Sequence, residues 1–174
     1  MSDIDFYVET VLRQTVLGVP LGSSPEEWEN KLGGDFLDDA RKGRMRRDYG
    51  LVEIAFVRRA GAWESVSVSL QIHRMARGLD GIVPRPLTDI HGDFSPQVPL
   101  DVFLRALRAQ GGDLEEGTEP SSGGFRQFRE TSTGTTLYVA DGSGQDALLE
   151  PASLWSIIVQ HQTAPVPSHQ SATS

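Results

Sequence analysis

The chain has 174 residues, a formal net charge of −8 and no cysteine. That length is enough for one domain with a buried core. The missing cysteine excludes a disulfide scaffold and a thiolate metal site. Residues 1–5 are acidic, unlike a signal peptide, and no apolar stretch approaches the roughly 18 residues that span a bilayer. These features predict a cytoplasmic protein without a membrane partner.

The net charge hides an uneven distribution along the chain. Residues 1–40 carry a net charge of −7, residues 41–77 carry +6, and residues 78–174 carry −7. A basic middle between acidic flanks has two interpretations. The folded chain neutralises itself internally, or it keeps an acidic surface that attracts a basic protein partner.

Residues 4–16 carry apolar side chains at helical spacing, among them Ile4, Val8 and Val11. The pattern predicts an amphipathic helix that ends before the Gly18 to Gly22 segment. Its polar face lacks the cations of a membrane-surface helix, so we expect it to pack on the rest of the protein.

A second helix is expected to begin after Ser24. The sequence Ser24-Pro25-Glu26-Glu27 matches a capping box with proline at the first helical position. Trp28 and Leu32 lie four residues apart and share one face, and the Gly33-Gly34 pair supplies the C-terminal stop.

Two alternating segments follow and predict an antiparallel hairpin. In residues 51–57, Val52, Ile54 and Phe56 alternate with more polar or smaller side chains. In residues 66–72, the apolar set Val66, Val68, Leu70 and Ile72 alternates with Ser67, Ser69 and Gln71, and His73 continues the polar side. This pattern is typical of strands with one buried face and one polar face.

Five cations lie between Arg41 and Arg47. They suit phosphate binding; alternatively they form a solvated turn, or serve as ion-pair partners for Asp35, Asp38 and Asp39. Aromatic residues are scarce around them, and the rest of the chain repels polyanions. The sequence therefore favours the turn, and nucleic acid is not an expected partner.

The second half repeats the order of helix and then strands. Residues 78–98 form a long irregular connection with three prolines, where the chain would divide if it had two halves. A helix is expected over 99–110, followed by strands at 125–130, 135–140 and 154–159. We predict a single α+β domain over 1–162, an antiparallel meander with helices on one face, and a disordered tail at 163–174.

The search for chemistry yields two histidine-centred candidates. Asp89, His91 and Asp93 offer ligands for a cation, but loops also use Asp and Gly to make turns, so metal binding stays open and no cofactor is predicted. His73 on the polar side of its strand lacks an evident nucleophile and orienting acid. Motifs for phosphate loops, nucleophile elbows and zinc sites are absent from the sequence, so an enzyme is not expected.

One stretch of about fifty residues has a recognisable pattern. A helix of the form Gly-x-Ser-x-x-Glu ends in Leu-Gly and precedes a Tyr-Gly strand entrance. The matching residues are Gly22, Ser24, Glu27, Leu32, Gly33, Tyr49 and Gly50. The pattern resembles small bacterial immunity proteins encoded beside polymorphic toxins. It is also similar to the helix-loop-helix and sheet unit of beta-lactamase inhibitory proteins and of small outer-membrane lipoproteins, although this chain lacks a lipobox cysteine. The resemblance implies a protein inhibitor and carries over no functional residue.

The leading hypothesis is a non-enzymatic protein-binding domain, an immunity-type inhibitor that occludes a basic toxin domain. Charge complementarity would speed its association. The expected partner-binding residues are acidic: Glu26, Glu29, Asp35, Asp38, Asp39, Asp113, Glu115, Glu116 and Glu119. The alternative is a small-ligand domain or enzyme that uses the 78–98 loop and the polar sheet face with His73 and Glu53. This alternative expects a concave pocket lined by Gln71, His73 and His91. The sequence does not indicate the oligomeric state.

Overall fold

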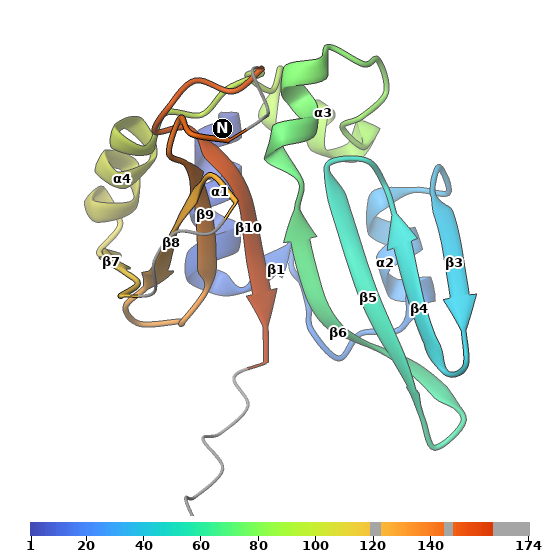
Figure 1. The fold of residues 1–174 in the computed structure, drawn as a ribbon. Helices are drawn as coiled ribbons and strands as arrows, with labels where there is room; N and C mark the ends of the chain where they lie inside the picture. The colour runs from blue at the N-terminus through green and yellow to red at the C-terminus, as the bar shows by residue number, and fades with distance from the viewer. Residues whose placement is uncertain (119–122, 145–147, 162–174) are drawn as a thin grey trace, which may run out of the picture.

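The computed structural model describes residues 1–118, 123–144 and 148–161. Its main strands are β3 (Leu37–Arg41), β4 (Arg44–Asp48), β5 (Val52–Arg59), β6 (Ala62–Leu70), β7 (Leu114–Glu116), β8 (Phe125–Glu130), β9 (Thr136–Ala140) and β10 (Leu154–Gln160). In the described residues they form one eight-stranded sheet in the order β3-β4-β5-β6-β10-β9-β8-β7 (Figure 1). Two antiparallel meanders thus meet at the central pair β6 and β10.

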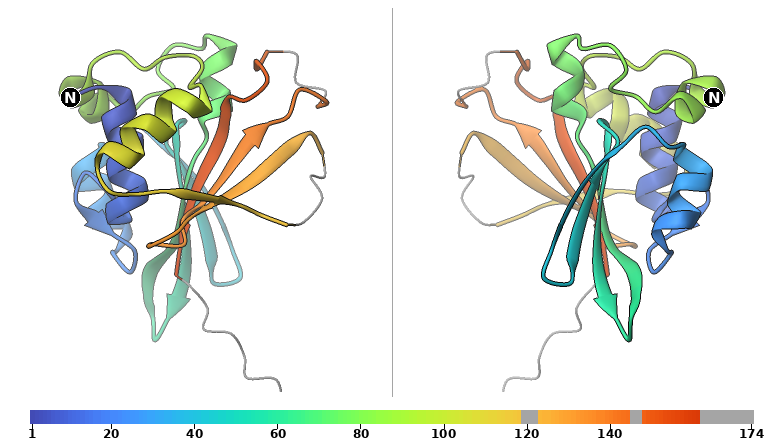
Figure 2. Two further views of the ribbon diagram at one scale, coloured as in Figure 1. Left: turned by 90° about the vertical axis from the view of Figure 1, so that its left-hand side faces the viewer. Right: turned by 90° about the vertical axis from the view of Figure 1, so that its right-hand side faces the viewer.

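The helices cover one face of this sheet and leave the other open. They are α1 (Asp3–Arg13), α2 (Pro25–Leu32), α3 (Arg85–His91) and α4 (Leu100–Ala109). Figure 2 shows all four on the same side of the strands, while the 3₁₀ helix η1 (Ile72–Arg77) lies at the end of β6. The predicted α+β class, with a meander sheet and helices on one face, is confirmed.

The predicted start of α2 is confirmed atom by atom. The backbone N–H of Glu27 donates to Ser24 Oγ at 3.3 Å, and the backbone N–H of Ser24 donates to Glu27 Oε2 at 2.7 Å. Trp28 and Leu32 are both buried against the sheet. The cap therefore fixes where the helix begins, and the apolar pair fixes which face turns inward.

The predicted hairpin is confirmed as β5 and β6, with Ile54 opposite Val68. A register shift between Ala55 and Phe56 changes the expected alternation. Ser65 takes the buried position opposite Phe56, and Val66 is only half-buried. The prediction that Val66 belongs to the buried set is therefore wrong, because a β-bulge moves the extra residue off the strand's alternating pattern.

The basic run is part of a hairpin as well as a turn. β3 and β4 are paired along their whole length: Leu37 is opposite Asp48 at one end, and Arg41 is opposite Arg44 at the other. Between them Lys42 and Gly43 both have positive φ, of 43° and 78°. Two such residues make the two-residue turn whose twist matches paired strands. This hairpin was not predicted, because β3 is exposed along its length and lacks an apolar alternation.

Other differences are at element ends and in short elements that the sequence did not predict. α1 stops at Arg13, because Gln14 adopts a left-handed φ of 54°, and β1 (Thr15–Val16) pairs with β2 (Val19–Pro20). Ile72 and His73 belong to η1 and not to a strand. The 78–98 connection contains α3, and β7 precedes the predicted strands. The predicted tail at 163–174 lies outside the described residues.

The core lies between the helices and the covered face of the sheet. It draws on both meanders: Ile54 and Leu70 from one, and Leu137 and Leu154 from the other, share a single buried cluster with Tyr7, Trp28 and Phe103 of the helices. Among the described residues, no helix is both long and apolar enough to cross a bilayer.

Candidate functional site

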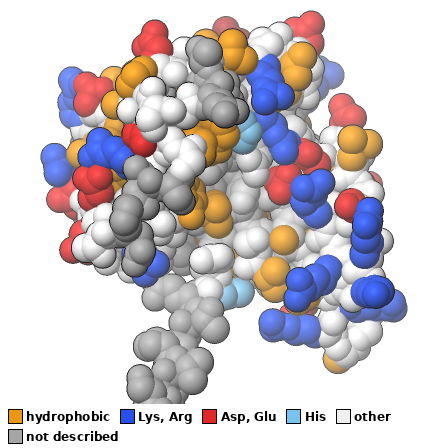
Figure 3. Space-filling model, in the orientation of Figure 1, with side chains coloured by type: hydrophobic (Ala, Val, Ile, Leu, Met, Phe, Trp, Pro, Cys, Tyr) orange, Lys and Arg blue, Asp and Glu red, His pale blue; other side chains and the backbone are white. Residues whose placement is uncertain are grey.

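The uncovered side of the sheet, here called the open face, is the principal candidate surface. Side chains on this side alternate along each strand with the buried core residues. Strand register aligns Arg44, Arg46 and Asp48 of β4; Glu53, Ala55 and Val57 of β5; Ser67 and Ser69 of β6; Ser156, Ile158 and Gln160 of β10; Thr136 and Tyr138 of β9; and Phe125, Gln127 and Arg129 of β8. Figure 3 looks onto this face. Its middle is mostly white, the colour of backbone and of side chains that are neither hydrophobic nor charged, and basic side chains gather towards the ends of the β3–β4 and β5–β6 hairpins.

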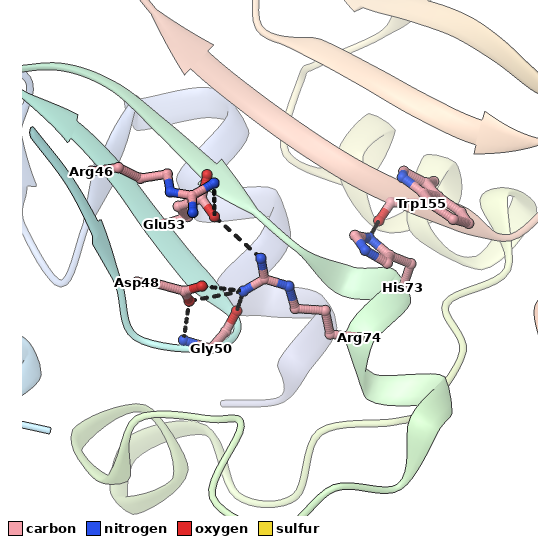
Figure 4. A network of polar contacts seen from close by, with 7 residues as sticks. All are labelled: Arg46, Asp48, Gly50, Glu53, His73, Arg74 and Trp155. Carbon is pink, nitrogen blue, oxygen red and sulfur yellow. Dashed lines mark hydrogen bonds and ion pairs between the residues drawn. The ribbon is translucent and has the colours of Figure 1, made fainter. Parts of the chain in front are cut away.

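Arg74 of η1 reaches over one half of the open face and ties the strands together (Figure 4). Its Nη1 donates to Asp48 Oδ1 and Oδ2 at 2.8 and 3.0 Å and to the carbonyl of Gly50 at 2.8 Å. Its Nη2 donates to Glu53 Oε2 at 3.2 Å. Arg46 approaches the same Glu53 oxygen at 4.0 Å.

This network is partly withdrawn from water, which gives it more weight than a surface ion pair. The side chains of Arg74 and Glu53 are 27% and 17% exposed. Water and salt screen the Coulomb attraction between partly buried charges less than that between exposed ones. Arg74, Asp48 and Glu53 each also have more than one partner, which limits how far they can move. The network therefore ties η1 to the turn between β4 and β5 and restrains this half of the open face.

Aromatic rings occupy the other half of the open face. The rings of His73 and Trp155 stack with centroids 4.2 Å apart and an angle of 6° between their planes. Phe125 lies 4.3 Å from Trp155, and His73 Nδ1 is 3.3 Å from the carbonyl oxygen of Trp155. A register shift after Leu154 places Trp155 in this position. The stack therefore joins η1, β8 and β10.

A cavity of about 810 Å³ adjoins the aromatic rings and is here called the aromatic hollow. Phe125, Trp155, Leu149 and Pro151 form its apolar wall, and glycines form much of the remainder. Gly124 and Gly144 approach so closely that a Cβ on Gly124 would lie 2.4 Å from the Gly144 Cα. A larger residue at Gly124 would push these two segments apart.

The acidic residues expected to bind a partner do not lie on one surface. Glu26 and Glu29 are on α2, Asp35 precedes β3, Asp38 and Asp39 are on β3, and Asp113, Glu115 and Glu116 are at β7. β3 and β7 are opposite edges of the sheet. Glu119 lies outside the described residues. The two groups are therefore separated by the full width of the sheet, and their partner contacts stay a prediction.

Several of these acids are paired within the chain. Asp38 pairs with Arg47 at 2.8 Å and Asp39 with Arg41 at 3.3 Å, as the internal-neutralisation interpretation expects. At the opposite edge, a backbone hydrogen bond from Leu114 and a side-chain bond from Arg108 lower the pKa of Asp113. The Arg126 guanidinium lowers the pKa of Glu116. Charged side chains on exposed edge strands also discourage edge-to-edge pairing with other chains.

The histidine-centred candidates are not brought together. His91 is buried on the helix side, where its ring packs near Phe6 and Phe94 and its Nδ1 lies 3.2 Å from the Ser2 carbonyl oxygen. His73 is on the open face, so the two do not line one pocket. Asp89 is exposed and lies 3.8 Å from Arg85. The described residues contain no group of three or more ligand-type side chains placed to hold a metal.

Sequence reasoning missed Arg74 and Trp155 as open-face residues. The available signal was the serine alternation in β6, which marks a polar face, but neither residue belongs to that alternation. Comparisons with protein-family models, curated proteins and solved structures found no match. The fold and the open face thus define the class: an α+β domain with one uncovered sheet face.

Proposed function

We propose that this chain is a non-enzymatic protein-binding domain that acts as an immunity-type inhibitor of a toxin, and that the open face is its docking surface. The observation that carries the proposal is that, within the described residues, helices cover only one side of the sheet (Figure 2) and the other side exposes aromatic and arginine side chains. Trp155, Tyr138 and Arg46 are of the residue types enriched at protein interfaces and among their energetic hot spots.

The size of the open face suits a folded protein partner. Eight strands spaced by about 4.8 Å span about 34 Å, and strands of average length extend for about 20 Å. The product is roughly 700 Å², close to the ~800 Å² that each partner contributes to a standard interface. A small ligand would need only a fraction of this surface.

Rigidity favours inhibition by occlusion. The Arg74 network and the His73–Trp155 stack hold η1 against both meanders in the free protein. A surface that is ordered before binding loses less conformational entropy when a partner docks. An inhibitor of this type blocks access to its target by covering it and needs no catalytic group.

A second candidate function is small-ligand binding, and the aromatic hollow favours it. Its volume of about 810 Å³ falls within the range of ligand pockets, and its wall combines aromatic rings with backbone groups. His73 stacks on Trp155 at its edge. A ligand there would contact Trp155 and Phe125 and leave the seam between β6 and β10 free.

The test introduces a bulky charge at the middle of the open face. Ser67→Arg lies on the central strand β6, opposite Gln160 of β10. Ala109→Arg, at an exposed position of α4, is the matched control. Tagged chains are used to capture partners from the native host, and complexes are sized by light scattering.

The proposal expects one partner in stoichiometric complex with the wild type and the Ala109→Arg variant, and loss of that same partner with Ser67→Arg. Thermal melts must show that both variants are folded. Failure to recover any stoichiometric partner, or a partner that survives Ser67→Arg, would contradict the open face as the docking surface.

A further inference from the structure

A second hollow, of about 500 Å³, lies at the far end of the open face from the aromatic rings. We call it the arginine hollow. Its lining includes Arg41, Arg44 and Arg46 with Asp39, around the apolar residues Ala55, Val57 and Val66. It lies beside the β3–β4 and β5–β6 hairpin ends, where basic side chains gather in Figure 3.

Cations outnumber anions at this end of the molecule. The hairpin ends carry Arg41, Lys42, Arg44, Arg46, Arg58 and Arg59 against Asp39 and Glu64. The whole chain has a net charge of −8, so this positive group stands out against its surroundings. An opposite-charge partner would be drawn to this end and oriented by it.

The arginines of the hollow are only partly neutralised. Arg41 pairs with Asp39 at 3.3 Å, and Arg46 is 4.0 Å from Glu53. Arg44 is exposed and makes no ion pair with another described residue. Its guanidinium, with five donors in a planar fork, suits a carboxylate that approaches from outside.

The floor of the hollow is aliphatic, and this distinguishes protein from nucleic acid as an occupant. The β-bulge brings Val66 beside Ala55 and Val57 on the open face. Aliphatic side chains bury apolar peptide side chains well, whereas single-stranded nucleic acid needs aromatic platforms for its bases. The only aromatic residue among the described lining, Phe56, is buried in the core.

We propose that the arginine hollow binds an acidic segment of the protein partner, an extended stretch in which carboxylates alternate with apolar side chains. An extended chain points successive side chains to opposite sides, so its apolar residues face the aliphatic floor while its carboxylates turn to the rim arginines. This inference rests on the proposed protein-binding function and names the chemistry of the contact.

The direct test uses a capped eight-residue peptide that alternates glutamate with valine. The ¹⁵N-labelled full chain is titrated with this peptide and followed by NMR. A peptide with lysine in place of glutamate and an eight-nucleotide oligothymidylate serve as ligand controls. Arg44→Glu is compared with Arg105→Glu, which makes the same charge change at an exposed arginine of α4.

The proposal expects the glutamate peptide to shift the amides of Ala55, Val57 and Val66, and the lysine peptide not to. Arg44→Glu should weaken binding at least about tenfold, Arg44→Lys by less, and Arg105→Glu hardly at all. Absence of shifts at the floor residues would overturn it. So would equal binding of oligothymidylate, because that result would show attraction to any polyanion.

The same variants separate this inference from the proposed function. A host partner that is lost with Ser67→Arg but retained with Arg44→Glu supports the open face and overturns the arginine hollow as a contact. A partner that is lost with both, while Arg105→Glu retains it, supports both. If no partner is recovered, the proposed function is contradicted. The peptide titration then tests separately whether the arginine hollow prefers the glutamate peptide to the lysine peptide and to oligothymidylate.

Discussion

Arg47 and Asp38 form a two-pronged ion pair between neighbouring strands of the sheet edge. Arg47 Nε donates to Asp38 Oδ1 at 2.8 Å, and Nη2 donates to Oδ2 at 2.9 Å. The guanidinium also lies 3.6 Å from the centroid of the Phe36 ring and donates to the Pro25 carbonyl. The arginine side chain is only 7% exposed. One of the acids expected to meet a partner therefore has a structural role.

Removing the Asp38 charge should destabilise the protein. Asp38→Asn leaves Arg47 enclosed without its main counter-charge, so we expect the free energy of unfolding to fall by about 2 kcal/mol. Urea denaturation measures it. Asp35→Asn is the control, because Asp35 is exposed and forms no ion pair with a described residue, and it should change stability by less than about 0.5 kcal/mol. Equal effects of the two substitutions would contradict a structural role for the Asp38 pair.

Glu130 should make stability depend on pH in the acid range. Burial alone would raise the pKa of this carboxyl, but hydrogen bonds from Thr133 and Ser132 outweigh it and lower the pKa from its ordinary 4.5. A lowered folded-state pKa means that the stabilisation is complete above about pH 4.5 and disappears as pH falls through the lower folded value. Denaturation between pH 7 and pH 3 measures this loss.

Two substitutions check the assignment to Glu130. Glu130→Gln removes the charge that accepts these bonds, so it should lower stability at pH 7 by about 2 kcal/mol and flatten the acid dependence. Glu116→Gln also removes a carboxylate with a lowered pKa, but this one is solvent-exposed, so its effect should be small. An acid dependence that persists unchanged in Glu130→Gln would point to another group.

Gly50 should not tolerate a side chain. Its φ is +90°, and a Cβ there would lie 2.2 Å from the carbonyl oxygen of Ile82. Gly61 has a similar φ of +86°, with nothing within 4 Å of the same added atom. We expect Gly61→Ala to cost about 1 to 2 kcal/mol from backbone strain alone and Gly50→Ala to cost about 2 kcal/mol more from the clash. Thermal and urea unfolding compare them; similar losses would mean that the Ile82 segment moves away easily.

Tyr7→Phe should keep or raise stability. Tyr7 is fully buried and its hydroxyl has no hydrogen-bond partner among the described residues; burial, and then the nearby charge of Asp3, raise its pKa. Removing an unsatisfied buried hydroxyl leaves the ring packing intact, so we expect a change between zero and a gain of about 1 kcal/mol. Tyr7→Leu, which loses the ring packed near Phe6 and Phe94, should instead be destabilising. A clear loss of stability in Tyr7→Phe would show that the hydroxyl has a partner after all.

Most of the regular elements were predictable because their causes are local. The Ser24 cap, the spacing of Trp28 and Leu32, and the alternation around Ile54 are properties of a few adjacent residues. Elements without such a signal were missed. β3 lies at an exposed edge and has no apolar alternation, and α3 begins among prolines in a segment that resembles an irregular connection.

The candidate site was less predictable, because its residues come together only through strand order. The residues around Arg74 in the sequence do not indicate that Asp48 and Glu53 are its partners. Likewise, the residues around His73 do not indicate a contact with Trp155, which is 82 positions away. The register shifts in the β5–β6 pair and after Leu154 in β10 also change which side chains face outward, as Val66 and Trp155 show.

By itself the sequence determined the α+β class, the capped helix α2 and the β5–β6 hairpin, since short-range hydrogen bonding and hydrophobic periodicity suffice for these. Only the tertiary structure decided that one face of the sheet stays uncovered, and that the predicted acids are divided between opposite edges. The physical reason is that the placement of a side chain on a sheet depends on pairing between distant strands, and one residue of register reverses it.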